Sequence, residues 1–262
     1  MDLWKYGIVK SRPILLVLSI LAISASCFAQ APAANAEDGA APRHEIFGIG
    51  IGFGDSRWAW PGEDVVVDGF VLALGLSLFE AHNGVGLGLG AQWTDDTLNG
   101  VHLSLVQHDA STMRGVQIAG FLNTGGRSEG LQIAGLANFI GEGAGVQISL
   151  FMNGNRVLMP PRNESYRDWY AKFDENEFTG VQLALLRNAA SCIKGVQIGL
   201  FNLAEVNLRG IQIGLLNASE DVRGLQIGAV NLARHLKGVQ IGILNYAADA
   251  AIPYLPLLNA HF

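Results

Sequence analysis

The sequence contains little cysteine and few aromatic residues. Of its two cysteines, Cys27 lies in an N-terminal segment that we expect to be removed, which leaves Cys192 alone. A single cysteine excludes an intramolecular disulfide, so packing and strand pairing must stabilise the fold. Aromatic residues make up only 8% of the chain. They do not recur at strand ends, so the pattern lacks the aromatic girdles typical of a transmembrane barrel.

Long apolar runs and concentrated positive charge are also missing. After the first 29 residues no clean apolar stretch reaches the roughly 18 residues that indicate a transmembrane helix. The formal net charge is -6 and no run of Lys and Arg occurs, which argues against a nucleic-acid-binding protein.

The N-terminus has the layout of an export signal. Lys5, Lys10 and Arg12 precede an apolar run over 14–23, and small residues follow it. This predicts a signal peptide over 1–29. Lipidation at Cys27 is the alternative, because 24–27 loosely resembles a lipobox. The Ala- and Pro-rich segment 30–43 predicts a linker, so we expect one exported β-repeat domain over 44–262.

A tandem repeat dominates this domain. Copies of the form G-V-Q-I-G-L-x-N follow one another every 14 or 15 residues over 100–259, with a single 35-residue step between Gly145 and Gly180. Such a period is the first indication of a repeat architecture. The recurring glycines are Gly100, Gly115, Gly130, Gly145, Gly180, Gly195, Gly210, Gly224 and Gly238, and a degenerate tenth copy has Ile252 in that place.

Each copy alternates as a β-strand does. In 209–217, Ile211, Ile213 and Leu215 fall on one side, whereas Gln212 and Gly214 fall on the other. A period of two indicates a strand, and glycine at this density would destabilise a helix. Glycine-alternating segments over 45–54, 65–79 and 84–93 predict further strands before the repeats.

The fold class is therefore all-β, and two architectures can use the units. The first is an antiparallel up-and-down outer-membrane-type β-barrel of about 12–14 short strands, with aliphatic residues toward lipid and Gly and Gln toward the lumen. The alternative is a β-solenoid of 14–15-residue coils, with the aliphatic face inward and Asn stacked at a corner. Phe262 as the last residue favours the barrel, whereas Pro253 and Pro256 suit an edge or capping strand.

The repeat resembles a bacterial surface-repeat family, known from leptospires and other Gram-negative bacteria, whose copies read G-x-Q-x-G-x-x-N. The match covers 100–259, with departures at His102 in the Gln place and at Arg187 before Asn188. The resemblance implies an envelope location and carries no activity. We expect a structural, pore-like or adhesion protein of the outer membrane or cell surface, in contact with membrane lipid. A soluble or lipid-anchored periplasmic protein that binds a partner is the alternative.

The segment 154–179 interrupts the period and differs in composition from its surroundings. It is polar and carries Tyr166, Trp169, Tyr170 and Phe173. Exposed aromatic residues favour contact with a partner. These four residues are therefore the candidate site for a protein or glycan, although the segment could equally fold back as a plug.

No catalytic, cofactor or metal motif rises above this background. His102 and His108 lie six residues apart, which is compatible with a zinc site, but we interpret them as solvated strand-end residues. Ser104 shares a face with His102, as a hydrolase pair would. Glycines at 48, 50, 52 and 54 superficially resemble a dinucleotide loop but alternate as in a strand. We expect no enzyme activity and no cofactor.

Two further polar sets are interpreted as structural. The acidic residues Asp174, Glu175 and Glu177 could bind calcium in a loop, but a charged run is normally just solvated. The recurring Gln and Asn residues could line a lumen or bind glycans. Because they repeat on every strand, cross-strand amide pairing is the interpretation we favour.

Overall fold

The computed structural model describes residues 43–50, 65–75, 77–155 and 176–262. The signal peptide and all of the linker except Arg43 lie outside the described residues. So do Tyr166, Trp169, Tyr170 and Phe173, together with Asp174 and Glu175.

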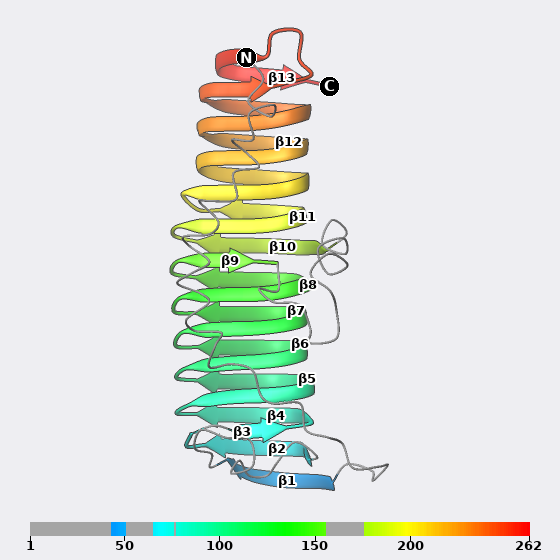
Figure 1. Ribbon diagram of the computed structural model, residues 1–262, viewed down its shortest axis with the longest axis vertical. Coiled ribbons are helices and arrows are strands. Elements are labelled where there is room, and N and C mark those ends of the chain that lie inside the picture. The colour runs from blue at the N-terminus through cyan, green and yellow to red at the C-terminus, as the bar shows by residue number, and fades with distance from the viewer. Residues whose placement is uncertain (1–42, 51–64, 76, 156–175) are drawn as a thin grey trace, which may run out of the picture.

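The described chain is a β-solenoid, a single column of stacked coils with β1 and β13 at opposite ends (Figure 1). The described residues contain strands and no helix, and hence no helix that could cross a membrane. From β1 to β12 every neighbouring pair is parallel, with partners mostly 14–16 residues apart. The strands are β1 (Arg43–Gly50), β2 (Val65–Ala73), β3 (Ser77–Phe79), β4 (Ala81–Gly88), β5 (Ala91–Ser104), β6 (Gln107–Ala119), β7 (Leu122–Ala134), β8 (Ala137–Ser149), β9 (Met152–Gly154), β10 (Glu177–Ala184), β11 (Arg187–Ile198), β12 (Phe201–Ala247) and β13 (Tyr254–His261).

The expectation of an antiparallel barrel is wrong, and the alternative of a solenoid is right. Gly115 pairs with Gly130 in parallel, so the chain runs in the same direction one repeat later. The reason is that one repeat forms a whole coil and not a single strand. Each coil has two strand segments: the first begins at the first glycine of the repeat, and the second leads to the first glycine of the next repeat. The short strand β9 shows the second segment by itself, because it pairs only with second segments of β8 and β11.

The first glycine of each repeat lies where two coils come into close contact. Gly195 has a φ of 144°, and a Cβ atom there would lie 1.9 Å from the carbonyl oxygen of Gly180 in the preceding coil. Only glycine accommodates both the positive φ and the close approach of the neighbouring backbone. The regular glycines of the sequence therefore mark one line of contact along the column.

A column of buried glutamine side chains runs through the interior. From Gln132 onward the side-chain amide of each Gln donates to Oε1 of the Gln one coil earlier, over 2.8–3.0 Å. Because each amide donates to one neighbour and accepts from the other, the interior satisfies polar groups that would otherwise be costly to bury. The glutamine column consists of Gln117, Gln132, Gln147, Gln182, Gln197, Gln212, Gln226 and Gln240.

A second buried column of asparagine side chains runs the opposite way. Each Asn donates to Oδ1 of the Asn one coil later, over 2.8–3.0 Å, and most donate a second bond to a backbone carbonyl. Structural amide pairing is thereby confirmed for both residue types. The asparagine column consists of Asn123, Asn138, Asn153, Asn188, Asn202, Asn217, Asn231 and Asn245.

Apolar side chains fill the rest of the interior beside these columns. The main buried cluster contains Ile140, Phe178, Ile193, Leu208, Val222 and Leu236, with alanines between them. All of these larger residues except Ile140 lie two positions before the first glycine of a repeat. The Val, Ile and Leu residues that follow the glycine point outward instead, so the expectation that a solenoid would turn this aliphatic face inward is wrong.

The segment 154–179 is an insertion within one coil. Gly180 pairs with Gly145, so the column continues in register across the 35-residue step. Asn155 ties the base of the insertion to the column, because its side chain donates to Asn176 O at 3.1 Å and accepts from Ser191 N at 2.8 Å.

The last copy of the repeat forms a cap instead of a coil. β13 pairs antiparallel with β12, so that Gly238 lies opposite His261. Asn259 extends the glutamine column by donating to Gln240 Oε1 at 3.3 Å. The prediction of a capping strand at the Pro-bearing end is confirmed.

Candidate functional site

The outward side chains that follow each glycine form one continuous aliphatic surface. Successive coils place them in register, as Val101 with Val116 and Leu103 with Ile118 show. We name the following three columns the aliphatic face. Its first column is Val85, Val101, Val116, Leu131, Val146, Val181, Val196, Ile211, Leu225 and Val239; its second is Leu87, Leu103, Ile118, Ile133, Ile148, Leu183, Ile198, Ile213, Ile227 and Ile241; its third is Leu89, Leu105, Gly120, Gly135, Leu150, Leu185, Leu200, Leu215, Ala229 and Ile243.

The aliphatic face is large for a monomer. Coils about 4.8 Å apart make it about 43 Å long, and strand residues two apart make its three columns about 13 Å wide. The resulting area of roughly 600 Å² is at the upper end of the apolar patches that monomeric proteins expose. The third column is the most open, with Leu89 63%, Leu185 64% and Ile243 74% exposed. Exposed apolar patches of this size are typical of surfaces that contact another molecule or a membrane.

The backbone beneath the aliphatic face is fully occupied by strand pairing. The in-register pairs of β4 to β12 place the hydrogen bonds along the column, from coil to coil. At its C-terminal end β13 covers the last coil. The face therefore presents side chains and almost no backbone N–H or C=O group that needs water, a condition for contact with hydrocarbon.

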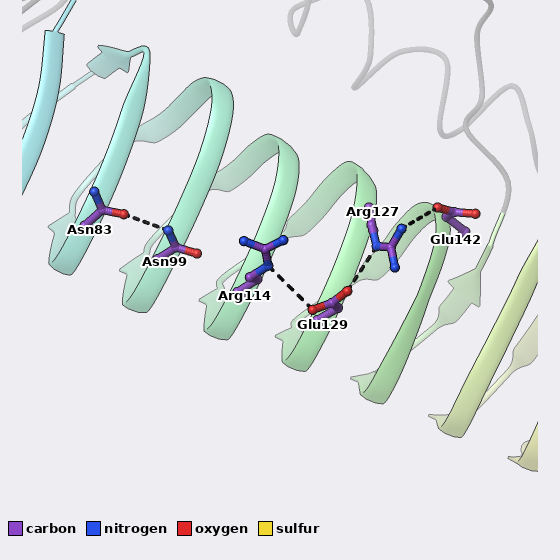
Figure 2. A network of polar contacts seen from close by, with 6 residues as sticks. All are labelled: Asn83, Asn99, Arg114, Arg127, Glu129 and Glu142. Atoms are coloured by element: carbon purple, nitrogen blue, oxygen red, sulfur yellow. Dashed lines mark hydrogen bonds and ion pairs between the residues drawn. The ribbon is translucent and has the colours of Figure 1, made fainter.

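One edge of the aliphatic face is a column of residues that lie directly before the first glycine of each repeat, all of them polar except Ala144. In the N-terminal half these residues pair with one another (Figure 2). Asn99 donates to Asn83 at 2.7 Å, and Arg114 lies 3.5 Å from Glu129. Arg127, from the adjacent column, bridges Glu129 at 3.1 Å and Glu142 at 3.3 Å.

In the C-terminal half the same column becomes positive on four successive coils. Lys194 pairs in register with Arg209, and the contacts of Gly224 with Gly210 and of Gly238 with Gly224 carry the register on. We name Lys194, Arg209, Arg223 and Lys237 the cation row. Lys194 has a carboxylate partner, Glu177, at 2.7 Å. In the described part of the chain no carboxylate lies within ion-pair distance of the other three.

The N-terminal end of the interior contains three histidines. His102 occupies the glutamine column and His108 the asparagine column, as their pairing with Gln117 and Asn123 shows. Both are buried, at 1% and 0% exposure, so the interpretation of these residues as solvated is wrong. The rings of His82 and His102 lie edge to face with centroids 4.5 Å apart, and the centroids of His102 and His108 are 6.2 Å apart.

Burial keeps these imidazoles neutral. Desolvation lowers the pKa of His102 to about 4 and that of His108 to about 3, and each neighbouring histidine adds to the effect. Desolvation also lowers the pKa of His82. Where the histidines begin, both amide columns end: Gln117 Nε2 and Asn123 Oδ1 have no hydrogen-bond partner among the described residues.

The other sequence-based candidates do not assemble into a site. Ser104 Oγ donates to Gly90 O at 2.5 Å and contacts Gln107 O at 3.1 Å, so it is engaged with backbone rather than with His102. No group of three His, Cys, Asp or Glu side chains in the described ranges is arranged to hold a metal ion. Gly48 and Gly50 belong to β1, which is a strand and not a phosphate-binding loop.

Comparisons with protein-family models, with curated proteins and with solved structures find no match to this chain. The sequence predicts the aliphatic face only in part. The alternation shows that its residues share one side of each strand, but it does not show that this side lies uncovered on the outside of a column.

Proposed function

We propose that this protein is an exported, peripheral scaffold protein of the bacterial envelope that lies with its aliphatic face on a lipid bilayer and has no catalytic role. The observation that supports the proposal best is the continuous aliphatic face. Burying roughly 600 Å² of apolar surface contributes about 15 kcal/mol before the costs of association are subtracted. Even a fraction of that energy is sufficient for stable attachment.

The composition of the face favours lipid over a protein partner. Protein interfaces depend on a few anchors, which are enriched in Trp, Tyr and Arg and differ from their surroundings. The columns of the aliphatic face contain only Val, Ile, Leu, Gly and Ala. One coil offers nearly the same side chains as the next. Such a surface recognises an apolar area and not a particular constellation of groups.

The interior construction supports the same proposal. Within the amide columns the buried side chains satisfy one another from coil to coil, and the strand pairing satisfies the backbone. The aliphatic residues are therefore not needed to form the core that Ile193, Leu208 and their neighbours provide. Export is the expectation from the sequence pattern over 1–29, and lipidation at Cys27 would also attach the protein to a membrane.

The proposal is tested by flotation of the protein, recovered from cells that express the full chain, with vesicles of the zwitterionic lipid phosphatidylcholine. We compare the unaltered protein with I213S/I241S. Both isoleucines lie in the second column of the face and are exposed, so their replacement removes apolar contact without opening the core. The variant should bind these vesicles about tenfold more weakly, since burying the exposed two fifths of each isoleucine contributes roughly 0.7 kcal/mol.

The matched control is V206S/I252S, which removes two aliphatic residues outside the three columns. Ile252 is 60% exposed in the loop before β13, and Val206 is half-buried in β12. The control should float like the unaltered protein. Equal binding of both variants, or a vesicle-free dimer that only I213S/I241S disrupts, would overturn the proposal, the latter in favour of a second copy as the occupant.

A further inference from the structure

We infer that the cation row, made of Lys194, Arg209, Arg223 and Lys237, binds the phosphate groups of anionic lipid headgroups. The inference rests on the proposed function, because it assigns the chemistry of the lipid surface on which the aliphatic face lies. It concerns the C-terminal half of the column, where the four residues occupy the same position on successive coils.

Four like charges in register are unfavourable without an anion. Neighbouring coils lie about 4.8 Å apart, and like charges directly opposite one another in a sheet destabilise it. In the N-terminal half the same edge has charges of both signs, so that Glu129 forms ion pairs with Arg114 and with Arg127 from the adjacent column (Figure 2). Of the four residues of the cation row, only Lys194 has a carboxylate partner among the described residues.

The position of the cation row fits a headgroup region. Arg209 lies two residues before Ile211, the first-column residue of the same coil, which is about 7 Å along a strand. Arg209, Arg223 and Lys237 are exposed, and their long side chains can reach past the edge of the face. With the aliphatic face on hydrocarbon, the cation row lies beside the buried area, from which its long side chains can extend to the lipid phosphates. Lys and Arg beside an apolar surface are the usual arrangement of interfacial membrane proteins.

The charge of the cation row favours a membrane over a second copy of this chain as the occupant of the aliphatic face. A second copy of this chain placed face to face would bring no row of acidic residues to the cation row. The corresponding column of the copy has only two acidic residues among the described ones, Asp68 and Glu129, and they are four coils apart. A membrane with phosphate groups supplies a dense array of anions. The exposed carboxylates Glu142 and Glu220 instead pair with arginines outside the row.

The test compares binding to phosphatidylcholine vesicles with binding to vesicles that also contain phosphatidylglycerol, at low and at high salt. At low salt the anionic vesicles should bind more tightly. The double variant R209Q/R223Q should lose about 25-fold in affinity for them, because each cation near an anionic surface contributes about fivefold. Its binding to the neutral vesicles should not change, and the difference should vanish at high salt.

R127Q/R234Q is the matched control, since it removes the same charge from two exposed arginines that pair with Glu142 and Glu220. A loss equal to that of R209Q/R223Q would overturn the inference, because it would show that only net charge matters. Inorganic phosphate added at constant ionic strength should leave vesicle binding unchanged; competition would overturn the assignment to headgroups. If the unaltered protein does not bind neutral vesicles, the proposed function of the aliphatic face is overturned. If it binds neutral and anionic vesicles equally well, only the inference about the cation row is overturned.

Discussion

The side chains of Gln182 and Gln147, 35 residues apart in sequence, hydrogen bond in the interior at 2.8 Å, with Nε2 of Gln182 donating to Oε1 of Gln147. The insertion 154–179 lies between them in the chain, yet the bond has the same length as those of uninterrupted coils. The glutamine column therefore maintains the register where the repeat is broken.

Replacing Gln182 by Leu should destabilise the protein by about 2–4 kcal/mol. The change keeps the volume but leaves Gln147 Oε1 without its donor and removes the acceptor of Gln197 Nε2, and both groups are buried. Urea denaturation followed by circular dichroism measures the loss. Thr179→Ala, an exposed position in the same strand, is the control. A loss below about 0.5 kcal/mol for Q182L would show that the column does not stabilise the fold.

Gly195→Ala should prevent normal folding. A Cβ atom at this position would lie 1.9 Å from Gly180 O, and the φ of 144° is strained for alanine. We expect a loss of about 3 kcal/mol or more, seen as a lower denaturation midpoint or as insoluble protein. Gly88→Ala is the control, since its nearest neighbours are atoms of the Gln92 side chain. Similar behaviour of the two variants would contradict the contact line of glycines.

Stability should fall as the pH drops below the ordinary pKa of histidine. His102 and His108 have folded-state pKa values of about 4 and about 3, below their ordinary value of 6.5. The unfolded chain therefore binds more protons in this window, and the free energy of unfolding decreases from pH 6.5 downward. Between pH 6.5 and 5 the loss should be about 1.5 kcal/mol for each histidine.

Two carboxyls oppose this trend at lower pH. Burial raises the pKa of Asp95 and of Asp109, so protonation of these groups favours the folded state. The clearest measurement is urea denaturation at pH 7 and pH 5 with H102Q/H108N, which continues both amide columns by one coil. The variant should be more stable than the unaltered protein and less sensitive to pH. An unchanged pH dependence would contradict the assignment to these histidines.

Removal of β13 (Tyr254–His261) should cause association of molecules through the exposed edge of β12. An uncovered strand edge presents unpaired N–H and C=O groups to other chains. Light scattering or size-exclusion chromatography of a chain that ends at Ala247 should show large assemblies. Deletion of Phe262 alone, which is 93% exposed, is the control and should leave the protein unassociated. A monomeric chain without β13 would contradict its role as a cap.

The sequence predicts the strands, the length of the repeat and the side on which each residue falls. It does not predict whether neighbouring strands are parallel, because Gln212 and Ile213 alternate identically in a barrel strand and in a solenoid coil. What distinguishes the two architectures is the second segment of each coil. Its outward residues, such as Leu203 and Glu205, are a mixture of apolar and polar types, so the sequence pattern does not show that this segment is a strand. Parallel stacking is favoured because it brings identical amides into contact at every coil.

The histidines and the cation row were harder to predict. His102 was identified as a departure from the glutamine place, but only the coil register shows that such a place is buried. Arg209 and Arg223 each resemble an ordinary solvated residue before a glycine. Their charges become a feature only when the coils are stacked, because residues 14 apart in sequence then lie side by side.

The most direct test of the central claim measures how deeply each side of the column enters a bilayer. Spin labels are placed singly at Ile213, in the aliphatic face, and at Glu220, on the exposed surface where it pairs with Arg234. Accessibility to oxygen and to a water-soluble nickel chelate is then recorded with vesicles. The account predicts that the label at 213 becomes accessible to oxygen and protected from the chelate, while the label at 220 stays in water. Equal exposure of both labels to the chelate on bound protein would contradict it.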